Sequence, residues 1–323
     1  MTDLANLFRQ DSLELTILPT EGCNLRCKYC YVDHNSLVMS NDVISNIKAL
    51  IERRAPTLKY VRIGWFGGEP LLQKDIILDI SRYVFDLKNE YPSIDFQGGM
   101  STNGIFLDIK TMEALVAVNI NAFQISLDGP KEFHDQLRVH PNGSGSFAKI
   151  WENLLNLKKS KLVFEVIIRI HISHDNIKII PDFLEEIYQA FGGDNRFQIF
   201  FKALAPLSKE DTGTKYFSEQ EQEQIISGFS EKLNDRMPES EASKNNDQYI
   251  CYAARPTSFV IRPDGSLIKC TIGLDDDFNQ IGKLLPGGTL SIDQDKMRCW
   301  IAGATILDRT LMRCPRQGIT NPE

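Results

Sequence analysis

The sequence predicts an α/β protein built on a partial, TIM-like (β/α)6 barrel with a small cysteine-rich domain after it. Over the first 207 residues, short β-rich runs alternate with stretches of helical spacing, which indicates parallel β/α units. Residues 208–250 are polar and charged, and 251–323 hold four of the seven cysteines. An open doubly wound sheet is the alternative for the first part.

Six runs rich in β-branched and aromatic residues are expected to form the strands. They are Leu13–Leu18, Tyr60–Trp65, Phe96–Ser101, Ala122–Leu127, Leu162–Ile172 and Phe197–Ala203. Between them, apolar residues recur at helical spacing within 43–51, 76–87, 112–116, 151–157 and 177–191. These stretches predict the helices that connect the strands.

The chain is expected to divide into a barrel at 1–207, a linker at 208–250 and a small domain at 251–323. Within the linker, Ser218 and Glu221 form a capping box ahead of one helix. In the last part, the turn sequence Pro263-Asp264-Gly265 predicts a β-hairpin that brings Cys270 back toward Cys251.

Composition excludes several classes of protein. The 323 residues include 36 Lys and Arg against 43 Asp and Glu, a net charge of −7, which disfavours a nucleic-acid-binding surface. No apolar run reaches the roughly 18 residues of a membrane span, and the N-terminus does not resemble a secretory signal. We therefore expect a cytoplasmic protein without membrane or nucleic-acid partners. In that reducing compartment, cysteines indicate metal binding rather than disulfides.

The sharpest motif is a group of three cysteines directly after the first expected strand. Cys23, Cys27 and Cys30 have the spacing C-x3-C-x2-C. Iron–sulfur clusters are ordinarily held by four cysteines, so three would leave one iron open to a small molecule. A zinc site, with His34 as a fourth ligand, is the alternative.

This motif resembles the signature of the radical S-adenosylmethionine (radical SAM) superfamily, in which an aromatic residue, here Tyr29, precedes the last cysteine. Three further motifs follow in the expected order and indicate the SPASM/TWITCH branch, which includes maturases of ribosomal peptides. They are Gly67-Gly68-Glu69-Pro70, Ser101-Thr102-Asn103-Gly104, and Ser126-Leu127-Asp128-Gly129-Pro130 with His134-Asp135 and Arg138. Each is expected at the carboxyl end of a strand, where β/α barrels bind ligands.

The resemblance implies a [4Fe–4S] cluster on the three cysteines, with S-adenosylmethionine bound to it. Glu69 would meet the methionine amine, and Ser126 and Asp128 the ribose. Arg169, a cation inside an apolar strand, would bind the methionine carboxylate or, as the alternative, a carboxylate of the barrel. The expected cofactor-binding residues are Tyr29, Gly67, Gly68, Glu69, Ser101, Asn103, Ser126, Asp128 and Arg169.

The C-terminal cysteines resemble the opening of a SPASM or TWITCH domain, where a cysteine and a Gly-x4-Cys segment hold an auxiliary [4Fe–4S] cluster. Four thiols are available for it: Cys251, Cys270, Cys299 and Cys314. A four-thiolate zinc site or inert buried thiols are the alternatives.

The function implied is an oxidoreductase that cleaves S-adenosylmethionine reductively to a 5′-deoxyadenosyl radical, which abstracts hydrogen from a ribosomal peptide. The expected outcome is an oxidative thioether, C–C or C–O crosslink. A precursor peptide and an electron donor of flavodoxin or ferredoxin type would be the partners. No catalytic base is identified.

Two other functions stay open. One is an enzyme resembling the anaerobic sulfatase maturases, although Thr271 stands where they carry an acidic residue. The other is a non-catalytic iron–sulfur or zinc interaction protein. Because about 20 residues precede the cysteine loop, a leader peptide is expected to bind the barrel mouth, the linker helix or a separate protein.

Overall fold

The computed structural model describes residues 7, 9–207, 215–233, 236–238, 240 and 249–320. Within them the chain has an α/β fold with a mostly parallel sheet, as the sequence predicts. It divides into two compact units. The first unit contains 1–22, 34–99 and 245–323, and the second contains 23–33 and 100–244. The three-part domain division drawn from the sequence stays a prediction.

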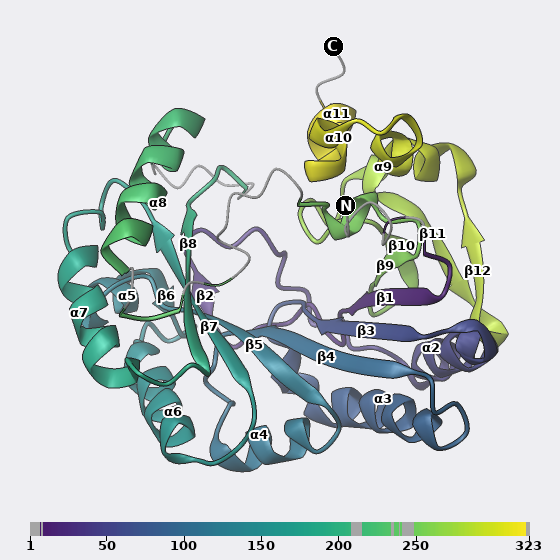
Figure 1. Cartoon of the computed structure of the whole chain (residues 1–323), viewed down its shortest axis with the longest axis horizontal. Coiled ribbons are helices and arrows are strands. Elements are labelled where there is room, and N and C mark those ends of the chain that lie inside the picture. The colour runs from purple at the N-terminus through teal and green to yellow at the C-terminus, as the bar shows by residue number, and fades with distance from the viewer. Residues whose placement is uncertain are drawn as a thin grey trace. The chain divides into compact units, whose positions relative to one another are not determined.

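The first unit contains β1 (Ser12–Ile17), β3 (Tyr60–Trp65) and the start of β4 (Asp95–Thr102). Strands β1 and β3 are parallel, with Leu15 opposite Ile63. In both strands every second residue is buried, the pattern of a sheet with one face more deeply covered. Helices α2 (Asn41–Arg54) and α3 (Lys74–Asp86) pack on each other, as Figure 1 shows.

The C-terminal part of this unit extends the same sheet. The predicted hairpin is confirmed as β9 (Ser258–Ile261) and β10 (Ser266–Ile268), and Gly265 in its turn has a φ of +81°. Strand β9 also pairs in parallel with β1, which the sequence did not indicate. Two further antiparallel strands, β11 (Gln280–Leu285) and β12 (Thr289–Ile292), follow.

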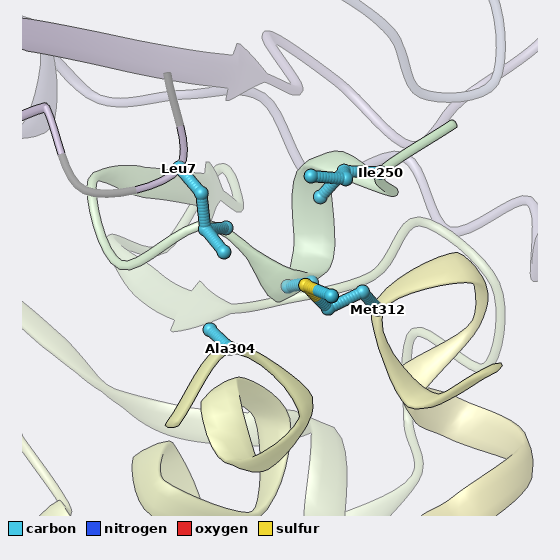
Figure 2. Packing of buried hydrophobic residues seen from close by; sticks show 5 residues of the cluster. Leu7, Ile250, Ala304 and Met312 are labelled. Atoms are coloured by element: carbon cyan, nitrogen blue, oxygen red, sulfur yellow. The ribbon is translucent and has the colours of Figure 1, made fainter. Parts of the chain in front are cut away.

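Three helices complete the first unit, α9 (Gln294–Ile306), α10 (Arg309–Arg313) and α11 (Pro315–Thr320), and they contact one another. A buried apolar cluster joins α9 and α10 to Leu7, near the N-terminal end of the chain (Figure 2). Its members are Leu7, Ile250, Ala254, Ala304 and Met312. The cluster includes residues directly beside Cys251 and close to Cys314, so it fixes the segments that carry these cysteines.

The second unit contains the parallel strands β5 (Ile120–Ser126), β7 (Glu165–Ile172) and β8 (Phe197–Ala203). Aromatic side chains contribute to the packing of its helices on these strands. For example, Phe191 stacks on Phe197 at 4.6 Å between ring centroids. The helices are α4 (Ile109–Val116), α5 (Lys131–Leu137), α6 (Phe147–Lys159) and α7 (Ile180–Phe191). Two short strands, β2 (Arg26–Cys27) and β6 (Arg138–Val139), pair antiparallel.

The predicted linker helix is present as α8 (Glu219–Leu233). Its capping box is confirmed, because the Glu221 backbone N–H donates to Ser218 Oγ at 3.3 Å and the Ser218 backbone N–H donates to the Glu221 carboxylate at 2.8 Å. Phe229 stacks on Phe201 of β8, which docks the helix. Residues 208–214, 234–235, 239 and 241–248 of the expected linker lie outside the described residues.

All six predicted strands of the first part are present with small shifts in their ends. The largest shift is at the fifth, where the expected Leu162–Ile172 begins only at Glu165. Six 3-10 turns complete the described elements: η1 (Ala55–Thr57), η2 (Pro70–Gln73), η3 (Leu87–Asn89), η5 (Tyr252–Ala254), η6 (Asp277–Asn279) and η7 (Pro286–Gly288). None of the helices in the described part combines the length and the apolar character needed to cross a bilayer.

Candidate active site

The loop of Cys23, Cys27 and Cys30 is held by backbone pairing within the second unit. Cys27 on β2 lies opposite Arg138 on β6. The Lys28 N–H donates to the Leu137 carbonyl at 3.0 Å, and the Cys30 N–H donates to the Cys27 carbonyl at 3.1 Å. This pairing fixes the backbone between the second and third cysteines without using their thiols.

The three thiols suit an iron–sulfur cluster in their chemistry. All three are thiols outside any disulfide, and all three are half-buried. Burial raises the pKa of the Cys27 and Cys30 thiols, and the Arg138 charge opposes this at both. The Leu25 N–H donates to Cys23 Sγ at 3.4 Å, a contact that stabilises a thiolate. In the described part of the chain, no group of three or more Cys, His, Asp or Glu side chains is arranged so that it could hold a metal ion.

Tyr29 joins the cysteine loop to a buried polar network. Its hydroxyl donates to the Asp128 carboxylate and accepts from Arg138 Nη1 at 2.8 Å. His171 Nδ1 lies 2.8 Å from the other oxygen of Asp128. The structure therefore brings together two predicted residues, Tyr29 and Asp128, and adds His171, which the sequence did not single out as a functional residue.

The charge state of this network follows from burial and pairing. Burial lowers the pKa of His171, so its neutral ring donates Nδ1–H to Asp128. Burial opposes ionisation of Asp128, but the hydrogen bond from His171 and the charge of Arg138 hold the pKa of this carboxyl below its usual value. The network is thus a buried carboxylate with a neutral imidazole, a phenol and one guanidinium around it.

The motif His134-Asp135 supports the Asp128 loop from behind. The Asp128 N–H donates to His134 Nδ1 at 3.4 Å, and His134 Nε2 lies 3.0 Å from Ser146 Oγ. Asp135 Oδ1 accepts from the backbone N–H groups of Ser146 and Phe147, both at 2.9 Å, at the start of α6. Both residues act on the backbone that carries the site.

Asn176 is a further residue of this network. Its side-chain Nδ2 donates to the carbonyls of Asp128 at 2.8 Å and His171 at 2.7 Å, and its Oδ1 accepts from the Ser173 N–H at 2.8 Å. It ties the loop after β5 to the end of β7. In the sequence, Asp128 is 48 residues and His171 is 5 residues from Asn176, so the contact with Asp128 exists only in the folded chain.

Asn103 connects the third motif to the first cysteine. Its Nδ2 donates to Asn24 Oδ1 at 2.8 Å and lies 4.0 Å from Cys23 Sγ. Ser101 and Ser126 lie at the ends of β4 and β5, as expected, with their side chains half-buried. The ends of these strands therefore carry the polar groups that the sequence places there.

Gly67, Gly68 and Glu69 follow β3 in the first unit. A Cβ on Gly67 would lie 2.1 Å from the Thr20 carbonyl oxygen, and one on Gly68 would lie 2.3 Å from that of Gly22. The glycines thus allow close approach to the backbone just before Cys23. Glu69 is fully buried, and its Oε1 accepts from the Leu71 N–H at 2.9 Å at the start of η2.

Arg169 lies on β7, with Ser126 as its register partner. Its guanidinium lies over the Phe200 ring at 5.6 Å, and burial lowers its pKa. Its buried Nε has no hydrogen-bond partner, and no ion pair joins it to a carboxylate among the residues that the structure describes. A partly buried cation of this kind is suited to an anionic ligand.

Hydrogen bonds link the segments that carry three of the four C-terminal cysteines in the first unit. The Cys251 N–H donates to the carbonyl of Met312, two residues before Cys314, at 3.0 Å. The hydroxyl of Tyr252 accepts from the Thr271 N–H at 2.9 Å, which ties the residues that follow Cys251 and Cys270. Burial raises the pKa of Cys251 to about 11, and the neighbouring thiols of Cys270 and Cys314 add to the rise.

Cys299 differs from the other three. It is exposed on α9, and its Sγ donates to the Asp295 carbonyl of its own helix at 3.4 Å. The structure thus groups Cys251, Cys270 and Cys314 by their backbone and leaves Cys299 on a helix surface.

Comparison with known families assigns the chain to a class. The family model described as "Radical SAM superfamily" matches residues 17–187, which is more than half of the chain. This range includes the three cysteines, all four motifs and Arg169. The chain belongs to the radical SAM superfamily, and the prediction of a radical SAM enzyme is confirmed at that level.

Related sequences include sulfatase-maturating enzymes. The chain is 28% identical over 207 residues to the cysteine-type anaerobic sulfatase-maturating enzyme of Clostridium novyi (strain NT), covering 61% of this chain and 53% of that one. It is 31% identical over 147 residues to the serine-type enzyme of Bacteroides thetaiotaomicron, covering 42% and 34%. The matched stretch spans about half or less of these two relatives.

Solved structures share the fold. Native anSMEcpe with bound AdoMet and the Kp18Cys peptide has a TM-score of 0.68 at 19% identity, over 90% of this chain and 84% of that chain. Streptococcus suis SuiB bound to the precursor peptide SuiA has a TM-score of 0.58 at 15% identity, over 93% and 68%. At these identities the likeness concerns the fold.

Proposed function

We propose that this protein is a radical SAM peptide-modifying enzyme, with a partial (β/α)6 barrel followed by a SPASM/TWITCH-like domain. Cys23, Cys27 and Cys30 would hold a [4Fe–4S] cluster with S-adenosylmethionine on its open iron. When reduced by one electron, this assembly supplies a 5′-deoxyadenosyl radical, which takes a hydrogen atom from the substrate. The superfamily match over all four motifs is the observation that carries the proposal.

This chain's own residues would bind and orient the nucleoside. Asp128 is held as an ionised, fixed acceptor, which suits the ribose hydroxyls. Arg169, with its unpartnered Nε, suits the methionine carboxylate rather than the barrel carboxylate that was the alternative. The buried carboxylate of Glu69 suits the methionine amine. Tyr29, Ser101, Asn103 and Ser126 would complete the site.

A second cluster is proposed at the C-terminal cysteines. Cys251, Cys270 and Cys314 would be its principal ligands, because hydrogen bonds between their neighbouring residues draw the three segments together. Cys299, the fourth predicted ligand, is exposed and would contribute least. Such a centre can take up the electron left on the substrate, which makes the overall reaction an oxidation such as a thioether, C–C or C–O crosslink.

The experiment that tests the enzyme class uses anaerobically reconstituted full-length protein. With dithionite and S-adenosylmethionine we expect 5′-deoxyadenosine by mass spectrometry, and none from Cys27→Ala prepared in the same way. Protein that contains zinc without inorganic sulfide, or that releases no 5′-deoxyadenosine, would contradict the proposal and favour a non-catalytic interaction protein.

Sulfatase maturation is the second candidate, since the relatives above include enzymes of that name. Thr271 follows Cys270 here, and its backbone N–H and hydroxyl are both engaged by the Tyr252 hydroxyl. A hydroxyl used in this way supplies no carboxylate base, which favours the peptide-crosslinking function. Incubation with a sulfatase-derived cysteine or serine peptide separates the two: conversion to an aldehyde would establish maturation.

A precursor peptide and a flavodoxin- or ferredoxin-type electron donor are the proposed partners. Helix α8 is a candidate for peptide docking, because only Phe229 and Leu233 of its 15 residues are buried. Deletion of residues 216–236 should weaken peptide binding measured by fluorescence polarisation. Unchanged affinity, in protein that keeps its iron, would remove the helix from the proposal.

A further inference from the structure

The guanidinium of Arg138 is a buried positive charge beside the cysteine loop. The residue is 8% exposed. Its β6 position lies directly opposite Cys27 of β2 in an antiparallel pair, so its backbone is fixed relative to that ligand. Directly opposite residues of such a pair have Cβ atoms about 5 Å apart. The charge is therefore built into the loop that carries the second and third cysteines.

One N–H group of the Arg138 side chain is hydrogen-bonded, and another has no partner among the described residues. Nη1 donates to Tyr29 Oη at 2.8 Å, which orients the guanidinium. Nε is buried and has no partner among the described residues. A buried N–H without a partner is energetically costly, so native proteins rarely keep one. Inorganic or cysteine sulfur of a cluster on this loop would be a suitable acceptor for it.

Asp128 and the cysteine thiols differ as partners for the positive charge of Arg138. Asp128 is the one carboxylate of the network, and its oxygens already accept from Tyr29 and His171. Cys27 lies directly opposite Arg138 in the strand pair, and the positive charge of Arg138 also acts on Cys30. Arg138 thus acts on the thiols of both Cys27 and Cys30. The Cys23 thiol instead has the Leu25 backbone N–H and Asn103 Nδ2 near it.

From this geometry we propose that Arg138 tunes the reduction potential of the cluster on Cys23, Cys27 and Cys30. A cluster that gains one electron from an external low-potential donor becomes more negative by one charge, while the donor is oxidised by one electron. A fixed cation in a weakly polar environment stabilises that extra charge and raises the potential. Arg138 is a positioning and electrostatic residue here, and it touches neither substrate nor the reacting carbon.

The inference rests on the proposed cluster, and the test separates the two. Full-length protein is reconstituted anaerobically, and its iron and sulfide are measured before a redox titration followed by electron paramagnetic resonance. Arg138→Gln removes the charge and keeps an amide donor for Tyr29, whereas Arg138→Lys keeps the charge. The matched control is Arg26→Gln, which removes an exposed cation from the same short strand pair.

We expect the midpoint potential of Arg138→Gln to fall, so that at a fixed potential the ratio of reduced to oxidised cluster drops at least tenfold. For a one-electron couple this corresponds to about 59 mV. Arg138→Lys and Arg26→Gln should shift it by clearly less, because the first keeps the charge and water screens the second. Loss of iron from Arg138→Gln alone, with Arg138→Lys fully loaded, also supports a role of the charge.

The inference is overturned by a fully loaded Arg138→Gln variant with the wild-type potential. It is also overturned when Arg138→Gln and Arg138→Lys lose iron alike, since shape rather than charge would then matter. A wild-type protein without iron and sulfide defeats the proposed function itself, and so the two failures are distinguishable.

Discussion

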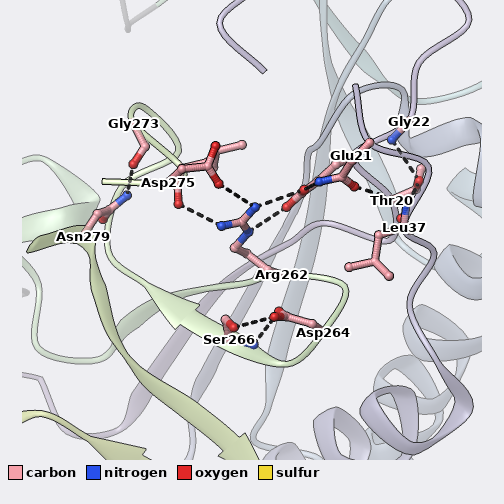
Figure 3. A network of polar contacts seen from close by, with 12 residues as sticks. Thr20, Glu21, Gly22, Leu37, Arg262, Asp264, Ser266, Gly273, Asp275 and Asn279 are labelled. Carbon is pink, nitrogen blue, oxygen red and sulfur yellow. Dashed lines mark hydrogen bonds and ion pairs between the residues drawn. The ribbon is translucent and has the colours of Figure 1, made fainter. Parts of the chain in front are cut away.

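Arg262 and Glu21 form a two-point ion pair that fastens the C-terminal hairpin to the backbone just before Cys23. Arg262 Nε lies 2.7 Å from Glu21 Oε1, and Nη2 lies 3.1 Å from Oε2 (Figure 3). Asn35 also donates to the Glu21 carboxylate, and Arg262 has a second carboxylate in Asp275 at 3.0 Å. The Glu21 side chain is 2% exposed against 19% for Arg262.

This asymmetry makes the two halves of the pair unequal. Arg262→Met leaves a buried carboxylate with only Asn35, and we expect it to lower the free energy of unfolding by about 3 kcal/mol. Glu21→Gln leaves a partly exposed guanidinium that still has Asp275, and we expect about 1 kcal/mol. Urea unfolding of both variants under identical conditions measures the difference. Equal losses would show that burial of Glu21 does not control the pair.

Two neighbouring glycines give a matched test of how the turn η7 docks on α2. Gly287 and Gly288 have nearly the same φ, +70° and +72°. A Cβ on Gly287 meets nothing within 4 Å, whereas one on Gly288 would lie 2.1 Å from the backbone nitrogen of Leu50. We expect Gly287→Ala to cost about 1 kcal/mol for its left-handed backbone, and Gly288→Ala at least about 3 kcal/mol.

Thermal unfolding followed by circular dichroism would show this as a clearly lower Tm for Gly288→Ala. A Tm for the Gly288 variant as high as that of the Gly287 variant would mean that the turn moves away from α2 without loss.

Local signals made much of this fold predictable. The alternation of strands and helices, the capping box at Ser218 and the Gly265 turn depend on residues close together in sequence, and all are confirmed. The site motifs were found for the same reason. The pairing of β9 with β1 joins residues more than 240 positions apart, such as Leu15 and Phe259, and no local pattern specifies it.

The roles of His171 and Arg138 depend on such distant partners as well. His171 lies on an apolar strand where alternation alone places every second residue toward the core, and its partner Asp128 is 43 residues away. Arg138 was recognised as part of a motif, but its position opposite Cys27 follows from a two-residue strand pair. Strands this short have no periodicity to detect.

The C-terminal cysteines give a test of ligand assignment by metal content. Reconstituted wild-type protein should hold about eight iron atoms per chain, four for each cluster. Cys314→Ser should lose about half of this iron, because Cys314 lies in the group with Cys251 and Cys270. Cys299→Ser, the matched control, should keep nearly all of it, because that thiol is exposed on α9. Equal loss from both variants would make Cys299 a full ligand.

The stability of the fold in acid depends on His134. Its ring is fully buried between the Asp128 backbone and Ser146. Burial lowers its pKa from 6.5 to about 4, so the folded protein keeps the ring neutral while the unfolded chain takes up a proton below pH 6.5. The unfolded state therefore binds more protons between these two values, and the free energy of unfolding falls as the pH falls through this window.

Between pH 7.5 and pH 5 this histidine should account for a loss of about 2 kcal/mol in the free energy of unfolding. His171 adds a loss of the same sign over this range, since burial lowers its pKa, whereas the pKa of Asp128 is below its usual value and this carboxyl adds its loss only below about pH 5. His134→Gln keeps a polar side chain that does not titrate, so its pH dependence should be shallower by about 2 kcal/mol over this range. We also expect this variant to be less stable than wild type at pH 7.5. Urea titrations at the two pH values measure both slopes. Parallel slopes for variant and wild type would mean that His134 takes up its proton in the folded state as readily as in the unfolded chain.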